Sequence, residues 1–396
     1  MNIFVITPIY ATATEGDGAT PLVHYFAREW VKMGHNVTVF NFQAKFPRPY
    51  YWIGKLFQHQ LNSRFGILVP TIYPKDKDYL ADGVKVHKRC ITKFKPHTEY
   101  NNKNKEKMLH LIDDEICKVG TPDCFIGHWD SPCLEILPIL KEKYNRPITI
   151  VFHTNVFNLE VRYGSNILNV LKKIDIVGYR SKVAKIDFEK KYFVPKKSFI
   201  CYSGVSDAFL SAGETIPTYE NPIRNFAYVG SLIARKHASK LYDALCKSYP
   251  DGDFSVKYIG NGAEQDVIDS LYNEKKLGTV EFTGRIPRES IIEHLQTADV
   301  FAMISEGEIF GLVYLEAMAL GLITIGSCKE GIDGIIIDGV NGFLCEAGNS
   351  EELASIISKI KNMPREEIVK ISANARQTAL KFSDYNVAKQ YINTVL

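Results

Sequence analysis

Two glutamates, Glu308 and Glu316, are separated by seven intervening residues around the start of a predicted helix. The segment from Gly311 to Leu320 contains good helix formers and no proline, and a glycine follows it as a stop signal. Glu308 is therefore expected in a loop at the helix N-terminus, and Glu316 roughly 7–8 Å further along the axis. Such carboxylates suit the two ends of a long polar ligand, and the helix N–H groups between them suit an anion. The arrangement suggests a nucleotide-diphosphate sugar as the ligand. The plainer alternative is that Glu316 lies on the helix surface and Glu308 is a solvated loop carboxylate, with no ligand role for either.

The whole chain has 396 residues, which exceeds one ordinary hydrophobic core and predicts two domains. A hydrophobic content of 45% and a charged content of 23% are typical of a soluble globular protein. Eight scattered cysteines without a C-x-x-C pair favour reduced core thiols over disulfides or a zinc site. The apolar run near residue 2 lacks a preceding basic residue and reads as a buried strand rather than a signal peptide. Because no apolar stretch is long enough to span a membrane, we expect a cytoplasmic protein.

Charge is distributed unevenly between the two halves. Residues 1–200 carry 30 basic and 19 acidic side chains, a net charge of +11, whereas the remainder carries −8. The halves therefore look like domains with different partners. No basic helix or RNA-binding motif accompanies the charge, so nucleic acid is a weak candidate. An anionic acceptor, or peripheral contact with the anionic inner face of the cytoplasmic membrane, fits better.

Strand-like and helix-like segments alternate twice along the chain, which predicts an α/β protein with two doubly wound parallel sheets. The first series covers residues 1–203, and a polar segment with two prolines at 204–224 is predicted to be an interdomain linker. The second series covers residues 225–382, and a short helix at 383–396 closes the chain. In such sheets ligands bind beyond the carboxyl ends of the strands, so the loops there are the candidate sites. Residues 43–83 are less regular, and their aromatic residues are interleaved with lysines and arginines. This stretch could be a loop or a helical insertion, or it could contact an acceptor or a lipid.

The segment around the two glutamates resembles the E-x7-E donor-site motif of retaining glycosyltransferases with the GT-B fold, family 4 in particular. Further segments of the second half resemble this family in order and spacing. These are Phe226–Lys236 (FAYVGSLIARK), Tyr258–Gly262 (YIGNG), Val280–Gly284 (VEFTG), Ala298–Ser305 and Asn341–Leu344 (NGFL).

This resemblance implies roles for individual residues. Arg235 and Lys236 would bind the donor diphosphate and stabilise the leaving group, because placed cations favour a transition state in which phosphate charge develops. Glu308 would contact the donor sugar, and Glu316 the ribose hydroxyls. Ser231 stands where many members of the family have an arginine, which leaves Arg235 as the substitute. The further expected donor contacts are Gly230, Ser231, Arg285, Ile286, Ile309, Phe310, Gly311 and Leu312.

In the first half, Gly16 and Gly18 form a short glycine loop between the first strand and the first helix. It resembles the glycine turn of the family that faces the donor, but it is not a complete G-x-G-x-x-G, and an ordinary turn is an equal alternative. His153 resembles the sugar-contacting histidine of the family and is expected in the catalytic site. His128 also ends a predicted strand and is expected to be structural. The D-x-D at Asp251–Asp253 lies in a turn context and is interpreted as a turn rather than a metal site.

The resemblance implies a GT-B enzyme in which an N-terminal acceptor domain and a C-terminal donor domain enclose a cleft, and in which the helix at 383–396 crosses back onto the N-terminal domain. The expected reaction moves a sugar from a nucleotide-diphosphate sugar, with UDP first and GDP next, to a glycan or lipid-linked acceptor, as in polysaccharide biosynthesis. Retention of anomeric configuration by front-face displacement, without a metal or other cofactor, is the expectation from the family. The alternatives are a nucleotide-sugar epimerase or hydrolase of the same fold, and a non-catalytic subunit of a transferase complex.

Overall fold

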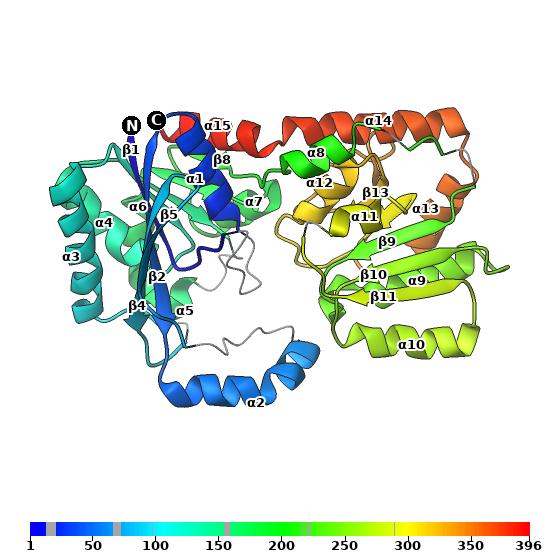
Figure 1. The fold of residues 1–396 in the computed structure, drawn as a ribbon, viewed down its shortest axis with the longest axis horizontal. Helices are drawn as coiled ribbons and strands as arrows, with labels where there is room; N and C mark the ends of the chain where they lie inside the picture. Colours follow the sequence, from blue (N-terminus) through cyan, green and yellow to red (C-terminus); the bar gives the residue numbers. More distant parts are fainter. Residues whose placement is uncertain are drawn as a thin grey trace. The chain divides into compact units, whose positions relative to one another are not determined.

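The computed structural model describes residues 1–12, 21–65, 73–96, 98–153, 159–215, 217–219, 222–288 and 290–396, with only the backbone of 58–65. The chain forms two compact units (Figure 1). The first comprises Met1–Leu56, Pro70–Gly204 and Asp384–Leu396, and the second comprises Phe57–Val69 and Val205–Ser383. The stretch expected to link two domains, residues 204–224, therefore lies almost entirely within the second unit, where it contains the helix α8 (Asp207–Ala212).

The first unit is built on an eight-stranded sheet with the order β3-β4-β2-β1-β5-β6-β7-β8. All neighbouring strands are parallel except β3, which pairs antiparallel with β4. The order reverses between β1 and β5, the point in such a sheet where a crevice opens beyond the strand ends. The strands are β1 (Asn2–Thr7), β2 (Asn36–Lys45), β3 (Lys77–Ala81), β4 (Val84–Thr92), β5 (Cys124–His128), β6 (Ile148–Phe152), β7 (Ile176–Tyr179) and β8 (Ser198–Ile200).

Apolar runs explain why the central strands of this sheet form. Ile3, Phe4, Val5 and Ile6 are completely buried, as are most residues of β5 and β6, because helices cover both faces of a parallel sheet. The helices that follow these strands in the chain are α1 (Leu22–Lys32), α2 (Arg48–Phe65), α3 (Asn102–Val119), α4 (Cys133–Tyr144), α5 (Leu159–Tyr163), η2 (Gly164–Asn166), α6 (Ile167–Lys172) and α7 (Lys182–Lys191).

Two further details of the first unit concern the start of helix α1 and the stretch 43–83. Helix α1 begins at Leu22, and Pro21 occupies its N-cap position. The irregular stretch 43–83 contains β3 and the helix α2, whose Trp52 and Leu56 side chains are 78% and 74% exposed. This stretch is thus partly a helical insertion, one of the alternatives left open by the sequence.

The C-terminal helix α15 (Asp384–Val395) belongs to the first unit, where it packs against α1 (Figure 1). Trp30 Nε1 donates a hydrogen bond to the Ala388 carbonyl oxygen at 2.9 Å, and Arg28 Nη2 contacts Asp384 Oδ2 at 3.1 Å. The Tyr391 ring lies edge-on to Trp30 at 5.1 Å. The last helix is therefore held by an aromatic core as well as by charge.

The second unit is built on a six-stranded sheet of parallel strands with the order β11-β10-β9-β12-β13-β14. In chain order this is 3-2-1-4-5-6, the arrangement of a dinucleotide-binding Rossmann sheet, and the order reverses between β9 and β12. The strands are β9 (Asn225–Val229), β10 (Ser255–Ile259), β11 (Thr279–Gly284), β12 (Val300–Ala302), β13 (Ile323–Ser327) and β14 (Phe343–Cys345).

Helices alternate with these strands (Figure 1). The most apolar of them, α12, connects β12 to β13 and packs against α14. Besides α8, the helices of this unit are η3 (Ala234–Lys236), α9 (Ala238–Ser248), α10 (Glu264–Lys275), α11 (Ile291–Leu295), α12 (Leu312–Ala319), α13 (Ser350–Lys361) and α14 (Arg365–Lys381).

In the part of the chain that the structure describes, we find no helix with the length and apolar character needed to cross a bilayer.

Candidate functional site

The loops after β9 and β12 meet at the point where the strand order of the second sheet reverses. The Glu306 N–H donates to the Arg235 carbonyl oxygen at 2.7 Å, and Arg235 Nη1 donates to the Glu306 carbonyl oxygen at 3.2 Å. Two loops that are distant in sequence are thus joined by reciprocal bonds. Ligands of such sheets bind in the crevice at this position, so the joined loops form the candidate site.

Lys236 and Glu308 face each other across these loops. Lys236 Nζ lies 3.1 Å from Glu308 Oε2, and each side chain is 15% exposed. Lys236 ends the short helix η3, and the left-handed conformation of His237 (φ 51°) then turns the chain into α9. The structure therefore brings together two of the residues predicted to be catalytic, as an ion pair that is largely withdrawn from water.

A third carboxylate, Glu330, fixes the backbone of Glu308. Its Oε1 accepts the Gly307 N–H at 3.0 Å, and its Oε2 accepts the Glu308 N–H at 2.7 Å. Burial raises the pKa of Glu330 above its ordinary value, and the nearby Glu308 adds to the rise, although the two N–H donors oppose it. Glu330 was not predicted from the sequence, because a lone glutamate in the loop after β13 carries no spacing signal.

The loop between Glu308 and α12 ends in a glycine whose conformation the site requires. Gly311 caps α12 with φ 70°, and a Cβ at this position would lie 2.4 Å from a ring carbon of Tyr314. Tyr314 is fixed in turn, because its hydroxyl donates to the Met303 carbonyl oxygen at 2.6 Å. Ile309 is half-buried and Phe310 is buried, and Leu312 begins the helix. The first N–H groups of α12 lie at an end where backbone donors have no partner inside the helix.

Replacing Gly311 by alanine is expected to destabilise the protein by about 2 kcal/mol, because left-handed backbone is costly for alanine. The Tyr314 ring must also move. Gly307 is a matched control, since it has φ 64° in the same loop but open space around its Cβ position. We expect Gly307→Ala to cost only about 1 kcal/mol. Urea unfolding of both variants measures the difference, and equal losses would contradict a steric role for Tyr314.

Glu316 lies on α12 and is paired with Arg288, which was not among the predicted site residues. Its Oε1 accepts Arg288 Nε at 2.7 Å and lies 2.5 Å from Arg288 Nη2. The Glu316 side chain is only 5% exposed, and that of Arg288 is 22% exposed. Arg285 and Ile286 follow β11 in the same loop as Arg288. Nε and Nη2 of Arg288 both contact the same oxygen of Glu316, which ties α12 to the loop after β11.

The glycines of the first loops of this unit are explained by close approach of backbone. Gly230 follows β9, and Ser231 is exposed directly after it. A Cβ on Gly260 would lie 2.0 Å from the Gly230 carbonyl oxygen, and one on Gly262 would lie 2.2 Å from the Leu232 carbonyl oxygen. The YIGNG segment therefore allows the loop after β9 to pass against the loop after β10.

His153 lies in the first unit at the end of β6. Its Nε2 is 2.8 Å from His128 Nδ1, and its ring stacks on Trp129 at 3.9 Å between centroids. His128 is completely buried, and its Nε2 lies 3.4 Å from the Tyr391 hydroxyl. His128 thus positions His153, in agreement with a structural role. The predicted contacts Gly16 and Gly18 lie outside the described residues.

Burial, reinforced by the Arg180 charge, lowers the pKa of His128 from 6.5 to about 3. Between these values the unfolded chain binds a proton that the native state does not bind. The free energy of unfolding therefore falls as pH falls, by up to about 1.4 kcal/mol per pH unit from this group. We expect the free energy of unfolding of the His128→Gln variant to depend less on pH between pH 6 and 5, because its unfolding takes up about one proton fewer than that of the wild type. Urea titrations at both pH values test this, and unchanged slopes would refute it.

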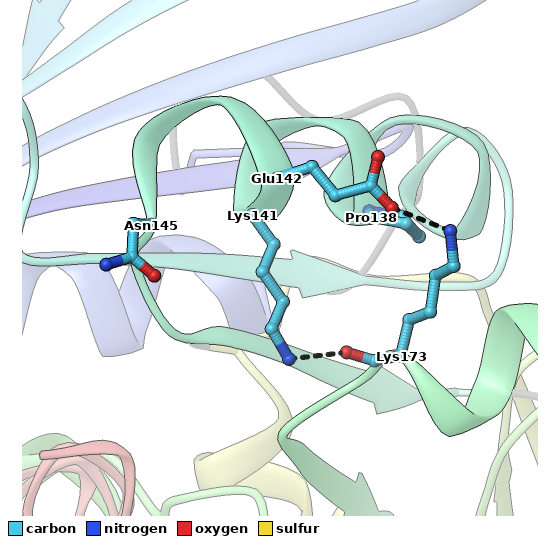
Figure 2. Close-up of a pocket in the computed structure, with 5 residues that line it drawn as sticks. All are labelled: Pro138, Lys141, Glu142, Asn145 and Lys173. Atoms are coloured by element: carbon cyan, nitrogen blue, oxygen red, sulfur yellow. Dashed lines mark hydrogen bonds and ion pairs between the residues drawn. The ribbon is translucent and has the colours of Figure 1, made fainter.

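One surface hollow of about 270 Å³ in the first unit contains none of the predicted site residues (Figure 2). Its wall is formed by Pro138, Lys141, Glu142, Asn145 and Lys173, and Lys173 Nζ is 2.7 Å from Glu142 Oε1. Its two lysines are already paired, Lys173 with Glu142 and Lys141 with Asp175, so it is not our candidate site.

Comparison with solved structures identifies the fold. The sucrose-phosphate synthase of Thermosynechococcus elongatus matches with a TM-score of 0.69 over 99% of this chain and 98% of that chain, at 17% sequence identity. HepE of Anabaena, in complex with UDP, matches with a TM-score of 0.68 over 100% of this chain and 99% of that chain, also at 17% identity. Two Rossmann-like units with these neighbours define a GT-B fold, as predicted.

Comparison with known sequences shows which protein family the second half of the chain resembles. Residues 220–378 match the family described as Glycosyl transferases group 1. An uncharacterized glycosyltransferase of Methanocaldococcus jannaschii is 26% identical over 66% of this chain and 71% of its own length. The alpha-monoglucosyldiacylglycerol synthase of Acholeplasma laidlawii is 31% identical over 42% of this chain. The aligned part covers less than half (43%) of the length of the synthase. The Lys236–Glu308 pair therefore lies within the region that matches Glycosyl transferases group 1.

Proposed function

We propose that this chain is a retaining glycosyltransferase of family 4. It transfers a sugar from a nucleotide-diphosphate sugar, with UDP preferred to GDP, to a glycan or lipid-linked acceptor. The observation that carries the proposal is the Lys236–Glu308 contact of 3.1 Å at the switch point of the donor-type sheet. It couples a cation suited to phosphate with a carboxylate suited to sugar hydroxyls, beside the N-terminus of α12.

The chemistry follows from how charge moves during transfer. When the bond between the sugar and the diphosphate breaks, negative charge develops on the leaving phosphate oxygens. Lys236, the exposed guanidinium of Arg235 and the N–H groups of Leu312 and its neighbours would stabilise that charge without a metal cofactor. Glu330 fixes the backbone of Glu308, and Glu308 would orient the sugar. Glu316 would hold the ribose. The incoming acceptor hydroxyl would attack the same face that the diphosphate leaves, with retention of configuration.

His153 is proposed to contact the sugar from the first unit, and Gly16 and Gly18 are proposed to approach the donor. Arg285, Ile286, Gly230 and Ser231 complete the proposed donor contacts. The UDP bound by the structurally similar HepE supports a uridine donor for this chain as well. The name of the synthase from Acholeplasma laidlawii supports a lipid-linked acceptor.

A place at the inner face of the cytoplasmic membrane, in polysaccharide or glycoconjugate synthesis, is also proposed. It is supported by the exposed side chains of Trp52 and Leu56 on α2, next to Lys55. Co-sedimentation with vesicles of anionic lipid tests this. Loss of the protein from the pellet in a Trp52→Ser, Leu56→Ser double variant would support it, whereas unchanged sedimentation would refute it.

The proposed function is tested by a thermal-shift screen with UDP, GDP, ADP and their sugars, repeated with Glu308→Ala and Lys236→Ala. We expect one nucleotide to raise the unfolding temperature of the wild type and each substitution to reduce that rise. Stabilisation and turnover that are unchanged in both variants would overturn the donor-site assignment. Donor turnover without any acceptor would instead indicate a hydrolase or epimerase, and binding without turnover over many acceptors a non-catalytic subunit.

A further inference from the structure

A second pocket opens in the first unit, at the carboxyl end of β4 and the N-terminus of α3. Its volume is about 210 Å³, and its wall includes Lys93, Tyr100, Asn101 and Asn104. A water molecule occupies about 30 Å³ of liquid, so the pocket has room for a group several times larger. None of the residues assigned to the proposed donor site lines it.

Lys93 is the unusual member of this wall. The residue is only 8% exposed, yet its Nζ has no hydrogen-bond or ion-pair partner among the residues that the structure describes. The ammonium instead lies 4.2 Å from the centroid of the Tyr100 ring. Burial lowers the pKa of Lys93, partly offset by the charge of Glu135. An ammonium with no anionic partner among the described residues is stabilised by a ligand that supplies one.

Glu135 does not supply that partner directly. Its Oε1 accepts the Ser131 hydroxyl at 2.6 Å, and its Oε2 accepts the Tyr100 N–H at 2.8 Å. The other carboxylate of the wall, Glu99, is paired with Lys105 at 3.2 Å. Glu135 and Glu99 thus bond to groups other than Lys93, and the N–H donors of Lys93 Nζ remain available to a ligand in the pocket.

The N-terminus of α3 adds donors on the same side. Asn101 caps the helix by accepting the Asn104 N–H at 2.9 Å, and Asn104 Nδ2 donates to the Thr92 carbonyl oxygen at 2.7 Å. These two bonds hold the start of the helix against the end of β4. The helix has 18 residues, and its first N–H groups and its dipole favour an anion beside Lys93.

From the free ammonium of Lys93 and the capped N-terminus of α3, we propose that this pocket binds a phosphate- or carboxylate-type group of the acceptor. The acceptor is thus an anionic molecule, and its identification as an acceptor rests on the proposed function. Binding of the anion in this pocket does not require sugar transfer, so the anion site and the proposed function can be disproved independently of each other.

Calorimetric titration with inorganic phosphate tests the site. The Lys236→Met variant is the background, because Lys236 is proposed to bind donor phosphate. Adding Lys93→Met is expected to weaken phosphate binding about 10–100-fold, since one charged hydrogen-bond donor is lost. Lys118→Met is the matched control, because Lys118 is an exposed lysine at the opposite end of α3 and should leave binding unchanged.

Lys93→Met should also unfold at the same temperature as its parent or higher, because an apolar side chain of similar length replaces a buried charge. A merely structural lysine would give a lower unfolding temperature instead. Repeating the titration with glucose 6-phosphate, and with vesicles of phosphatidylcholine and phosphatidic acid, distinguishes a soluble acceptor from a lipid headgroup. Dependence on Lys93 in either arm supports the site. Phosphate binding that is absent in the background protein, or equal with and without Lys93, overturns it whether or not sugar transfer is observed.

Discussion

Replacing Lys236 by methionine is expected to lower the kcat of sugar transfer about 10²–10³-fold, with a smaller change in KM. Lys236 is held at the switch point by η3 and by Glu308, at 15% exposure, where a charge is screened less than in bulk water. The leaving diphosphate gains its charge only as the bond breaks, so the ammonium stabilises the transition state more than the bound donor. Single-turnover and steady-state kinetics with the donor found by thermal shift measure the effect.

Lys240→Met is the control, because Lys240 is an exposed lysine on α9 one turn further along the chain. A Glu308→Gln variant and the Lys236→Met/Glu308→Gln double variant complete a cycle. If the pair acts as a unit, the double variant will lose much less than the product of the two single losses. A kcat for Lys236→Met within threefold of the wild type would remove this lysine from the proposed chemistry.

The fold was predictable because strand and loop signals are local. Buried parallel strands appear as short apolar runs, and the run near residue 2, predicted to be a buried strand, forms β1. The turn at Asp251–Asp253 was confirmed, since Gly252 has φ 76° and Asp253 pairs with Arg224 at 3.0 Å. Strand β3 was missed, because an exposed edge strand has no continuous apolar run.

The candidate site was only partly predictable. The resemblance placed Lys236 and Glu308 in one site, but the contact between them depends on how two loops pair after folding. Glu330 and Arg288 act through bonds to residues that lie 22 and 28 positions away in the sequence, so no helical or strand spacing pattern could reveal them. Part of the family-like sequence has a structural role, since buried Asn341 closes a turn by accepting the Ile337 N–H at 2.7 Å.

Removal of Arg288 is the substitution expected to affect stability most. Glu316 is 5% exposed and faces the Arg288 fork, so Arg288→Met leaves a buried carboxylate without its cation. Breaking such a pair costs about 3–5 kcal/mol when both partners are buried, and the partial exposure of Arg288 reduces the expected loss to about 3 kcal/mol. Urea unfolding without nucleotide measures this loss.

Glu316→Gln tests the cause of that loss. The amide keeps the shape of Glu316 but removes its charge, so adding it to Arg288→Met should restore most of the lost free energy of unfolding. The same double variant should still bind the nucleotide weakly, because the proposed ribose contact needs a carboxylate that accepts two hydroxyl hydrogen bonds. Stability that is not recovered in the double variant would show that Arg288 contributes through packing rather than through its charge. Recovered stability with full nucleotide affinity would instead limit Glu316 to holding α12 against the loop after β11, and the ribose contact would have to lie elsewhere.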